Sequence, residues 1–129
     1  MKFVKYWFPV LIYSGIIYFL SAQSKLQVPG AEIGFDKFAH LAEYGPFGWL
    51  ITRAVKNYRP KWSLAAIGGL VMLLIFAHAL ADEFHQSFVP GRDSSIFDAL
   101  ADLGGGAFGG WFYLKEISRK IIRKRKRQL

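Results

Sequence analysis

The sequence predicts an all-α fold, an integral membrane bundle of four transmembrane helices whose N- and C-termini are both cytoplasmic. Three observations support this prediction. Hydrophobic residues make up 53% of a chain of 129 residues, which is more apolar surface than a soluble domain of this size encloses in one core. Apolar stretches recur at lengths that cross a bilayer, and Lys and Arg residues gather beside alternate ends of those stretches.

The apolar stretches justify the individual helices. They cover about residues 3–22, 38–55, 62–81 and 96–114, and the helix of the third stretch is predicted to cover 62–88. Each is close to the roughly 20 residues that a helix needs to cross the hydrocarbon, and lipid cannot satisfy the backbone of an open sheet. Pro29-Gly30, Pro60 and Pro90-Gly91 lie between the stretches, as expected for connections. Residues 1–114 are therefore predicted to form one membrane domain, followed by a basic cytoplasmic tail over 115–129.

The first stretch has a second interpretation. Lys2 and Lys5 precede an apolar run, which is also the pattern of a secretory signal peptide. The cleavage pattern is poor, because Leu20-Ser21-Ala22 places Leu where a small residue is preferred. We therefore expect the stretch to be retained as a membrane helix.

The distribution of charge predicts the orientation. With the N-terminus in the cytoplasm, 14 of the 17 Lys and Arg residues fall on the cytoplasmic side, in agreement with the positive-inside rule. Eight of the nine acidic residues and all three histidines fall on the other side. The rule does not require this second asymmetry, which therefore indicates a specific role for the extracytoplasmic side.

Composition excludes several functions. The chain has no cysteine, which rules out disulfides, thiolate catalysis and cysteine-bound metals. The tail over 115–129 is basic but has no aromatic side chain that could stack on bases, so no nucleic acid partner is predicted. Its charge suits anionic membrane lipids instead. No cofactor is predicted.

Three segments place polar residues near the extracytoplasmic ends of the predicted helices. His40 and Tyr44 are four residues apart and share a helix face, as do Asp98 and Asp102, and Gly105 continues the face of the aspartates. Ionisable groups at membrane depth cost ~2.5–3.5 kcal/mol at the centre, so they usually face a bundle interior or a cavity. The predicted polar pocket consists of Asp36, Lys37, His40, Tyr44, His78, Asp82, Glu83, His85, Gln86, Arg92, Asp98 and Asp102.

Lys37 and Arg92 indicate the charge of the ligand. Both suit a phosphate or a carboxylate, and Arg can hold such a group with two parallel hydrogen bonds. The histidines and aspartates are ligand types for zinc, but no compact metal-binding spacing occurs and the two cations would oppose a metal ion. The sequence therefore predicts an anion-binding pocket without a metal.

At these residues the sequence resembles the VanZ-like membrane protein family. The resemblance rests on DKFAHLAEY at 36–44 with Gly48, on DEFHQSFVPGR at 82–92, and on Asp98, Asp102 and the glycines at 104–106; it covers about residues 6–114. The family pattern often has Asn at the position of Asp102, so this chain adds a charge there. The resemblance implies a small helical domain in the bacterial cell membrane. The named member of the family is linked to low-level resistance to the glycopeptide teicoplanin.

Four functions remain open. The pocket could engage an envelope component such as an anionic lipid, a lipid-linked cell-wall precursor or a glycopeptide. A membrane-embedded hydrolase or phosphotransferase would use His40 or His85 as a base or nucleophile, with Arg92 stabilising charge. A proton-coupled transporter would need ionisable groups in the cytoplasmic half of the helices, which are lacking. A purely structural cluster would only specify helix packing. We expect the first, without claiming catalysis, and the glycine-lined faces allow an oligomer.

Overall fold

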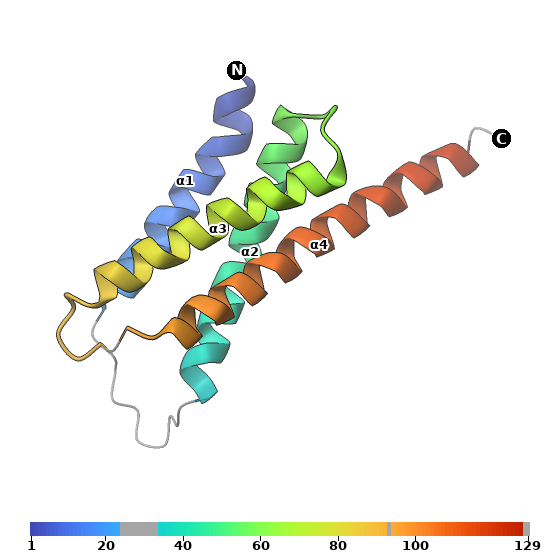
Figure 1. Ribbon diagram of the computed structural model, residues 1–129. Helices are drawn as coiled ribbons and strands as arrows, with labels where there is room; N and C mark the ends of the chain where they lie inside the picture. The colour runs from blue at the N-terminus through green and yellow to red at the C-terminus, as the bar shows by residue number, and fades with distance from the viewer. Residues whose placement is uncertain (24–33, 93, 128–129) are drawn as a thin grey trace.

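The computed structural model describes residues 1–23, 34–92 and 94–127 and contains, within those residues, four helices and no strands (Figure 1). The helices are α1 Lys2–Ser21, α2 Gly34–Tyr58, α3 Leu64–Gln86 and α4 Ile96–Lys126. The side chains at 34–36 and 125 lie outside this description, as does the predicted connection at Pro29-Gly30. The all-α prediction is confirmed.

Local sequence signals explain where α3 begins and ends. The Ser63 hydroxyl accepts a hydrogen bond from the backbone N–H of Ala66 (3.2 Å), which satisfies one of the unpaired donors of the first turn. After the helix, Gly91 adopts a φ of 79°, a conformation that is strained for residues with a Cβ atom. α3 is two residues shorter at each end than the helix predicted over 62–88.

Two helices are longer than the apolar stretches that predicted them. α2 covers 34–58 where 38–55 was expected, and α4 continues to Lys126 through the segment expected to form a separate tail. Lys, Arg and Glu are good helix formers, and an ion pair between Lys120 and Glu116, one turn apart, supports the extension. The loss of apolar character marks where a helix would leave the bilayer, but it does not mark where the helix ends.

α2 and α4 pack most extensively against each other, through glycines. A Cβ atom at Gly48 would overlap the backbone of Gly106, and one at Gly109 would overlap the carbonyl oxygen of Gly45. This close approach places the face of α4 that carries Asp98, Asp102 and Gly105 against α2. It also presses the polar first turns of α4 against α2.

The outer surface of the bundle is apolar. Its core contains Ile17 of α1, Ile51 of α2 and Ile75 of α3, while large apolar side chains such as Leu11 and Leu73 remain exposed. Among the described residues, α1 and α3 are long and apolar enough to cross a membrane. α2 and α4 carry more charged residues and fall outside that criterion.

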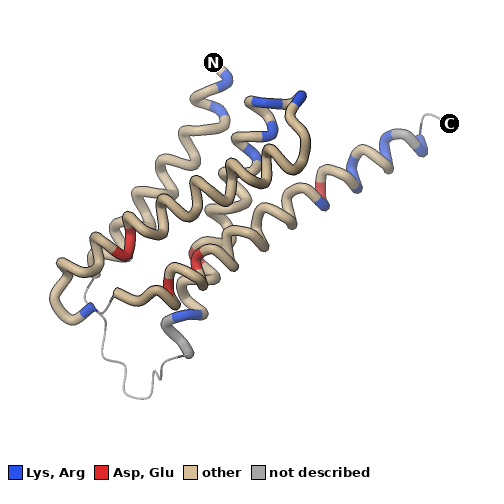
Figure 2. The backbone as a smooth tube through the Cα atoms, viewed as in Figure 1, with Lys and Arg blue, Asp and Glu red and all other residues tan. Residues whose placement is uncertain are grey.

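Charged residues separate along the bundle (Figure 2). Lys and Arg gather at the end formed by the N-terminus, the turn between α2 and α3, and the C-terminal part of α4. The acidic residues of α3 and of the first turns of α4 lie toward the opposite end, which we name the acidic end. Lys37 and Arg92 belong to this acidic end, so both signs of charge are present there.

Candidate functional site

Polar side chains from three helices meet inside the bundle at its acidic end. We name His40 of α2, Asp82 and Glu83 of α3, and Asp98 and Asp102 of α4 the acid–histidine cluster; all five are buried. Ligand-type atoms of His40, Glu83 and Asp98 lie within 4.8 Å of one another, and so do those of His40, Asp82 and Asp102. The cluster is therefore centred on His40.

His40 and Asp102 connect α2 to α4. His40 Nδ1 lies 2.9 Å from Asp102 Oδ1, and the two residues are 4% and 0% exposed. The contact forms because Asp102 shares a face of α4 with the glycines that pack against α2. A carboxylate at one ring nitrogen fixes the orientation of the imidazole.

The two carboxylates of α3 are held by different partners. Gln86 Nε2 donates to Asp82 Oδ2 at 3.0 Å, one turn further along the helix. The backbone N–H of Ser95 donates to Glu83 Oε2 at 2.7 Å. Because Ser95 immediately precedes α4, the second bond fixes the start of that helix against the end of α3.

Three buried carboxylate oxygens have no hydrogen-bond partner in the described part of the chain. They are Glu43 Oε1, Glu83 Oε1 and Asp102 Oδ2. An unpaired buried acceptor costs about 1–3 kcal/mol, and a charged one costs more. Such atoms call for an explanation, for example a proton, a water molecule or a bound ion.

Lys37 borders the cluster on its exposed side. Its Nζ lies 3.1 Å from Asp98 Oδ1, and the two side chains are 37% and 3% exposed. The ammonium group also lies over the ring of Phe97, 5.9 Å from the centroid. Lys37 therefore balances part of the negative charge of the cluster while remaining accessible from outside.

Arg92 is held by α1 instead of by the cluster. Its Nε donates to the carbonyl oxygen of Gln23 at 3.0 Å, and its Nη2 donates to that of Leu20 at 3.2 Å. Carbonyls at the C-terminal end of a helix attract cations, which explains this position. Lys37 and Arg92, predicted together as an anion-binding pair, thus contact different partners at the same end of the bundle.

A second polar group links α1, α2 and α3. Ser14 Oγ lies 2.7 Å from His78 Nε2, and Tyr44 Oη lies 2.9 Å from His78 Nδ1. Both ring nitrogens of His78 therefore have hydroxyl partners, and Phe47 packs against the ring at 4.5 Å between centroids. This arrangement satisfies His78 and Tyr44 as an interhelical network.

His85 also faces α1. Its Nδ1 lies 3.4 Å from Ser21 Oγ, and its ring stacks on Tyr18 at 4.1 Å between centroids. The sequence analysis missed Ser14 and Ser21, although hydroxyls seven residues apart in an apolar run lie on one helix face. That spacing was the available signal.

The structure therefore brings together part of the predicted pocket. The residues that meet at or directly contact the acid–histidine cluster are Lys37, His40, Asp82, Glu83, Gln86, Asp98 and Asp102. Tyr44, His78, His85 and Arg92 contact the other partners described above. The side chain of Asp36 lies outside the described residues.

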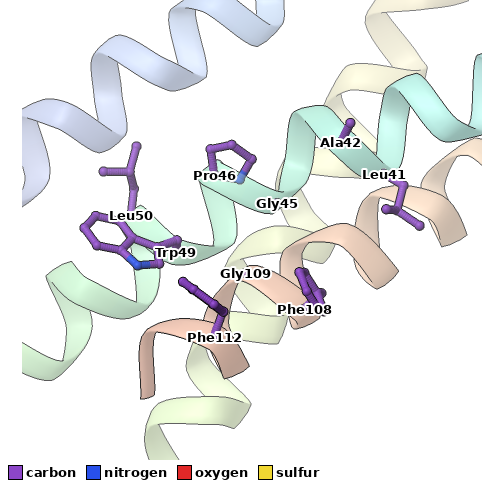
Figure 3. A pocket seen from close by; sticks show the side chains of 9 residues that line it. All are labelled: Leu41, Ala42, Gly45, Pro46, Trp49, Leu50, Phe108, Gly109 and Phe112. Carbon is purple, nitrogen blue, oxygen red and sulfur yellow. The ribbon is translucent and has the colours of Figure 1, made fainter. Parts of the chain in front are cut away.

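Two kinds of hollow border this region. A hollow of about 260 Å³ with both polar and apolar walls lies between the end of α3 and the start of α4, and Glu83, Ser94 and Ser95 contribute to its wall. An apolar groove of about 520 Å³ runs between α2 and α4 (Figure 3). Leu41 and Phe112 help to line this groove, and Leu41 directly follows the cluster residue His40.

These features define a class of protein: a small helical bundle with an apolar outside, helices suited to a membrane, and a buried acid–histidine cluster at one end. More specifically, the chain belongs to the VanZ/LLP1 family, whose sequence profile matches residues 3–121. The match includes every residue of the cluster and confirms the resemblance seen in the sequence. No curated protein and no solved structure matches the chain.

Proposed function

We propose that this chain is a multi-pass protein of the bacterial cell membrane whose acid–histidine cluster engages an anionic envelope component, either an anionic lipid or a lipid-linked cell-wall precursor. The observation that carries the proposal is the burial of four carboxyl groups and a histidine at one end of a bundle with an apolar outside. Ionisable groups inside a membrane protein are expensive, and they usually mark functional sites.

In this proposal all four helices cross the membrane. α2 has 25 residues and α4 has 31. At about 1.5 Å per residue, both exceed the roughly 30 Å of hydrocarbon. The positive-inside rule assigns the basic end, with both termini, to the cytoplasm. The acid–histidine cluster then faces the extracytoplasmic side, where cell-wall precursors are used.

The acidic end of the bundle has surfaces that complement both the headgroup and the hydrocarbon chain of such a lipid. Lys37 and Arg92 suit its phosphate, and the carboxylates of the cluster suit its hydroxyl or amine groups. The apolar groove, which begins at Leu41, suits its hydrocarbon chain. The resistance to teicoplanin implied by the resemblance would follow from contact with a precursor or with the glycopeptide itself.

Photo-crosslinking tests this proposal. Purified protein is labelled with a photoactivatable anionic phospholipid, and a lipid-linked precursor or teicoplanin competes in separate arms. Lys37→Gln combined with Arg92→Gln should reduce labelling several-fold, because the phosphate loses both cations. Arg59→Gln combined with Lys61→Gln, at the basic end, is the matched control. Equal labelling of the two folded double variants would contradict headgroup binding at the acidic end.

The His40–Asp102 contact supports a second function, a membrane-embedded hydrolase. An imidazole that is oriented by a carboxylate at 2.9 Å can act as a general base toward water. Lipid phosphates are the natural substrates to offer. Phosphate release that disappears in His40→Gln but persists in His85→Gln would support this function. Inertness of the wild-type protein toward several lipid phosphates would exclude it.

A further inference from the structure

We propose that the acid–histidine cluster is a binding site for a divalent transition-metal ion, such as Mn²⁺ or Zn²⁺. The candidate ligands are His40, Asp82, Glu83, Asp98 and Asp102. They form two groups of three that share His40, and within each group the ligand atoms lie within 4.8 Å of one another. One imidazole combined with carboxylates is a donor set that these ions accept.

The spacing is close to that of a coordination sphere. Ligand atoms at ~2.0–2.2 Å from a tetrahedral metal ion lie ~3.3–3.6 Å apart. The ligand atoms of each group lie within 4.8 Å of one another, so side-chain movements of about 1 Å would close them around one ion. The ligands also come from three helices, so each group is assembled by the tertiary fold.

Unpartnered oxygens provide an independent observation. Asp102 is 0% exposed, yet its Oδ2 has no hydrogen-bond partner in the described part of the chain. Glu83 is 9% exposed, and its Oε1 also has no hydrogen-bond partner among the described residues. Hydrogen bonds within the cluster use the other oxygen of each carboxylate, namely Asp102 Oδ1 and Glu83 Oε2. Each residue thus has a buried acceptor available for a further ligand.

Charge balance also favours a cation. Four buried carboxyl groups face His40 and the ammonium of Lys37, which contacts Asp98 from the exposed side. The sequence argued against a metal because Lys37 and Arg92 would repel it. In the structure, Arg92 donates to carbonyl oxygens of α1, whereas Lys37 is the cation in contact with Asp98 of the cluster. A dication would neutralise the surplus of negative charge that Lys37 leaves.

This site shares the carboxylates of the cluster with the lipid site proposed above, but metal binding does not depend on a lipid. The carboxylates would hold the ion inside the bundle, while the phosphate of the lipid headgroup would lie outside, near Lys37. Metal binding is therefore measurable in detergent without any envelope lipid. If the protein does not bind lipid, the metal proposal still stands. If it does not bind a metal ion, the lipid proposal still stands.

Elemental analysis and thermal unfolding test the site. The full chain is purified in detergent, treated with a chelator and dialysed against Mn²⁺ or Zn²⁺. We expect about one ion per chain and a metal-dependent rise in melting temperature. Asp102→Asn keeps the shape of the side chain but removes its charge, and it should weaken binding at least about tenfold. Asp82→Asn, which retains an acceptor for Gln86, is a second variant if the first does not fold.

Glu116→Gln is the matched control, because Glu116 is an acid on α4 that is paired with Lys120 at the basic end. It should bind the metal as the wild type does. Wild-type protein that binds neither ion above the level of nonspecific adsorption would overturn the proposal. So would a folded Asp102→Asn or Asp82→Asn variant with wild-type affinity, because the replaced carboxylate would then not be a metal ligand.

Discussion

Asp102 illustrates how single residues determine the character of this protein. It has no exposed surface, it contacts His40, and its second carboxylate oxygen has no partner in the described part of the chain. Burying a carboxylate usually costs more free energy than its contacts return. The cluster is therefore poorly explained by stability, and a ligand-binding role accounts for it better.

Asp102→Asn tests this view through stability. The amide oxygen can still accept from His40, while the surplus negative charge of the cluster falls. In the presence of a chelator we expect the melting temperature to stay the same or to rise, because a desolvated charge is removed. Thermal unfolding in detergent measures it. A fall larger than about 4 °C, which corresponds to roughly 1 kcal/mol in a chain of this length, would contradict the expectation.

Lys37→Met tests the ion pair at the edge of the cluster. The substitution leaves the Asp98 carboxylate, only 3% exposed, without its cation. Breaking a fully buried pair costs about 3–5 kcal/mol, and solvent screening of the half-exposed lysine should reduce this to about 1–3 kcal/mol. Chemical unfolding in detergent measures this change in the free energy of unfolding.

Lys120→Met is the control for this pair. Its ion pair with Glu116 joins side chains that are 71% and 39% exposed, so its loss should cost less than about 1 kcal/mol. Adding Asp98→Asn to Lys37→Met should recover stability, because the unpaired charge is removed. If Lys37→Met and Lys120→Met have equal effects, Asp98 does not depend on Lys37.

At the scale of helices, glycines decide which elements meet. Gly45 and Gly48 of α2 face Gly105, Gly106 and Gly109 of α4, and the two backbones approach closely along this line. Small residues promote such contacts in membranes because van der Waals packing replaces the hydrophobic effect between helices. The same contact brings His40 to Asp102, so helix packing and cluster geometry are coupled.

Gly109→Ala tests this coupling. The added Cβ would overlap the carbonyl oxygen of Gly45, so α2 and α4 must separate, at a cost of about 1–3 kcal/mol. Gly104→Ala is the matched control on the same helix, since a Cβ there meets no atom within 4 Å. Alanine should then stabilise the helix by about 0.5–1 kcal/mol. Unfolding free energies that change equally in the two variants would show that the glycine contact is not tight.

At the scale of the whole molecule, the separation of charge predicts one orientation in the membrane. Basic residues occupy one end of the bundle and the acid–histidine cluster lies toward the other (Figure 2). Moving either end across the bilayer would move many charges, so one orientation should be strongly preferred.

Thiol labelling in cells checks this orientation, and the absence of native cysteines makes single-cysteine variants unambiguous. Ser94→Cys, before α4, should react with a membrane-impermeant reagent in intact spheroplasts. Lys61→Cys, in the turn between α2 and α3, should react only after lysis. The reverse pattern would show the opposite topology, and equal accessibility of both positions would show that α3 does not cross the membrane.

The fold was largely predictable from the sequence, and the site was predictable only in part. The length of each apolar stretch was enough to predict a helix there. The four-residue spacing of Asp98 and Asp102 correctly placed both residues on the glycine face of α4. The predicted pocket also joined His78 and His85 to Asp82, but the structure divides these side chains among different neighbours. An arc of about 100° on one helix can touch two other helices, and the sequence does not say which. The position of Arg92 depended on carbonyl groups of α1, which leave no trace in side-chain patterns.

Mapping the sites of lipid attachment tests the central claim most directly, namely that the cluster end of the bundle binds an envelope lipid. The purified chain is crosslinked to an anionic phospholipid with a photoactivatable headgroup, and the modified peptides are identified by mass spectrometry. We predict saturable attachment concentrated around Lys37 and the hollow between α3 and α4. Attachment spread evenly over the exposed apolar surface, or concentrated at the basic end and not competed by unlabelled lipid, would contradict the claim.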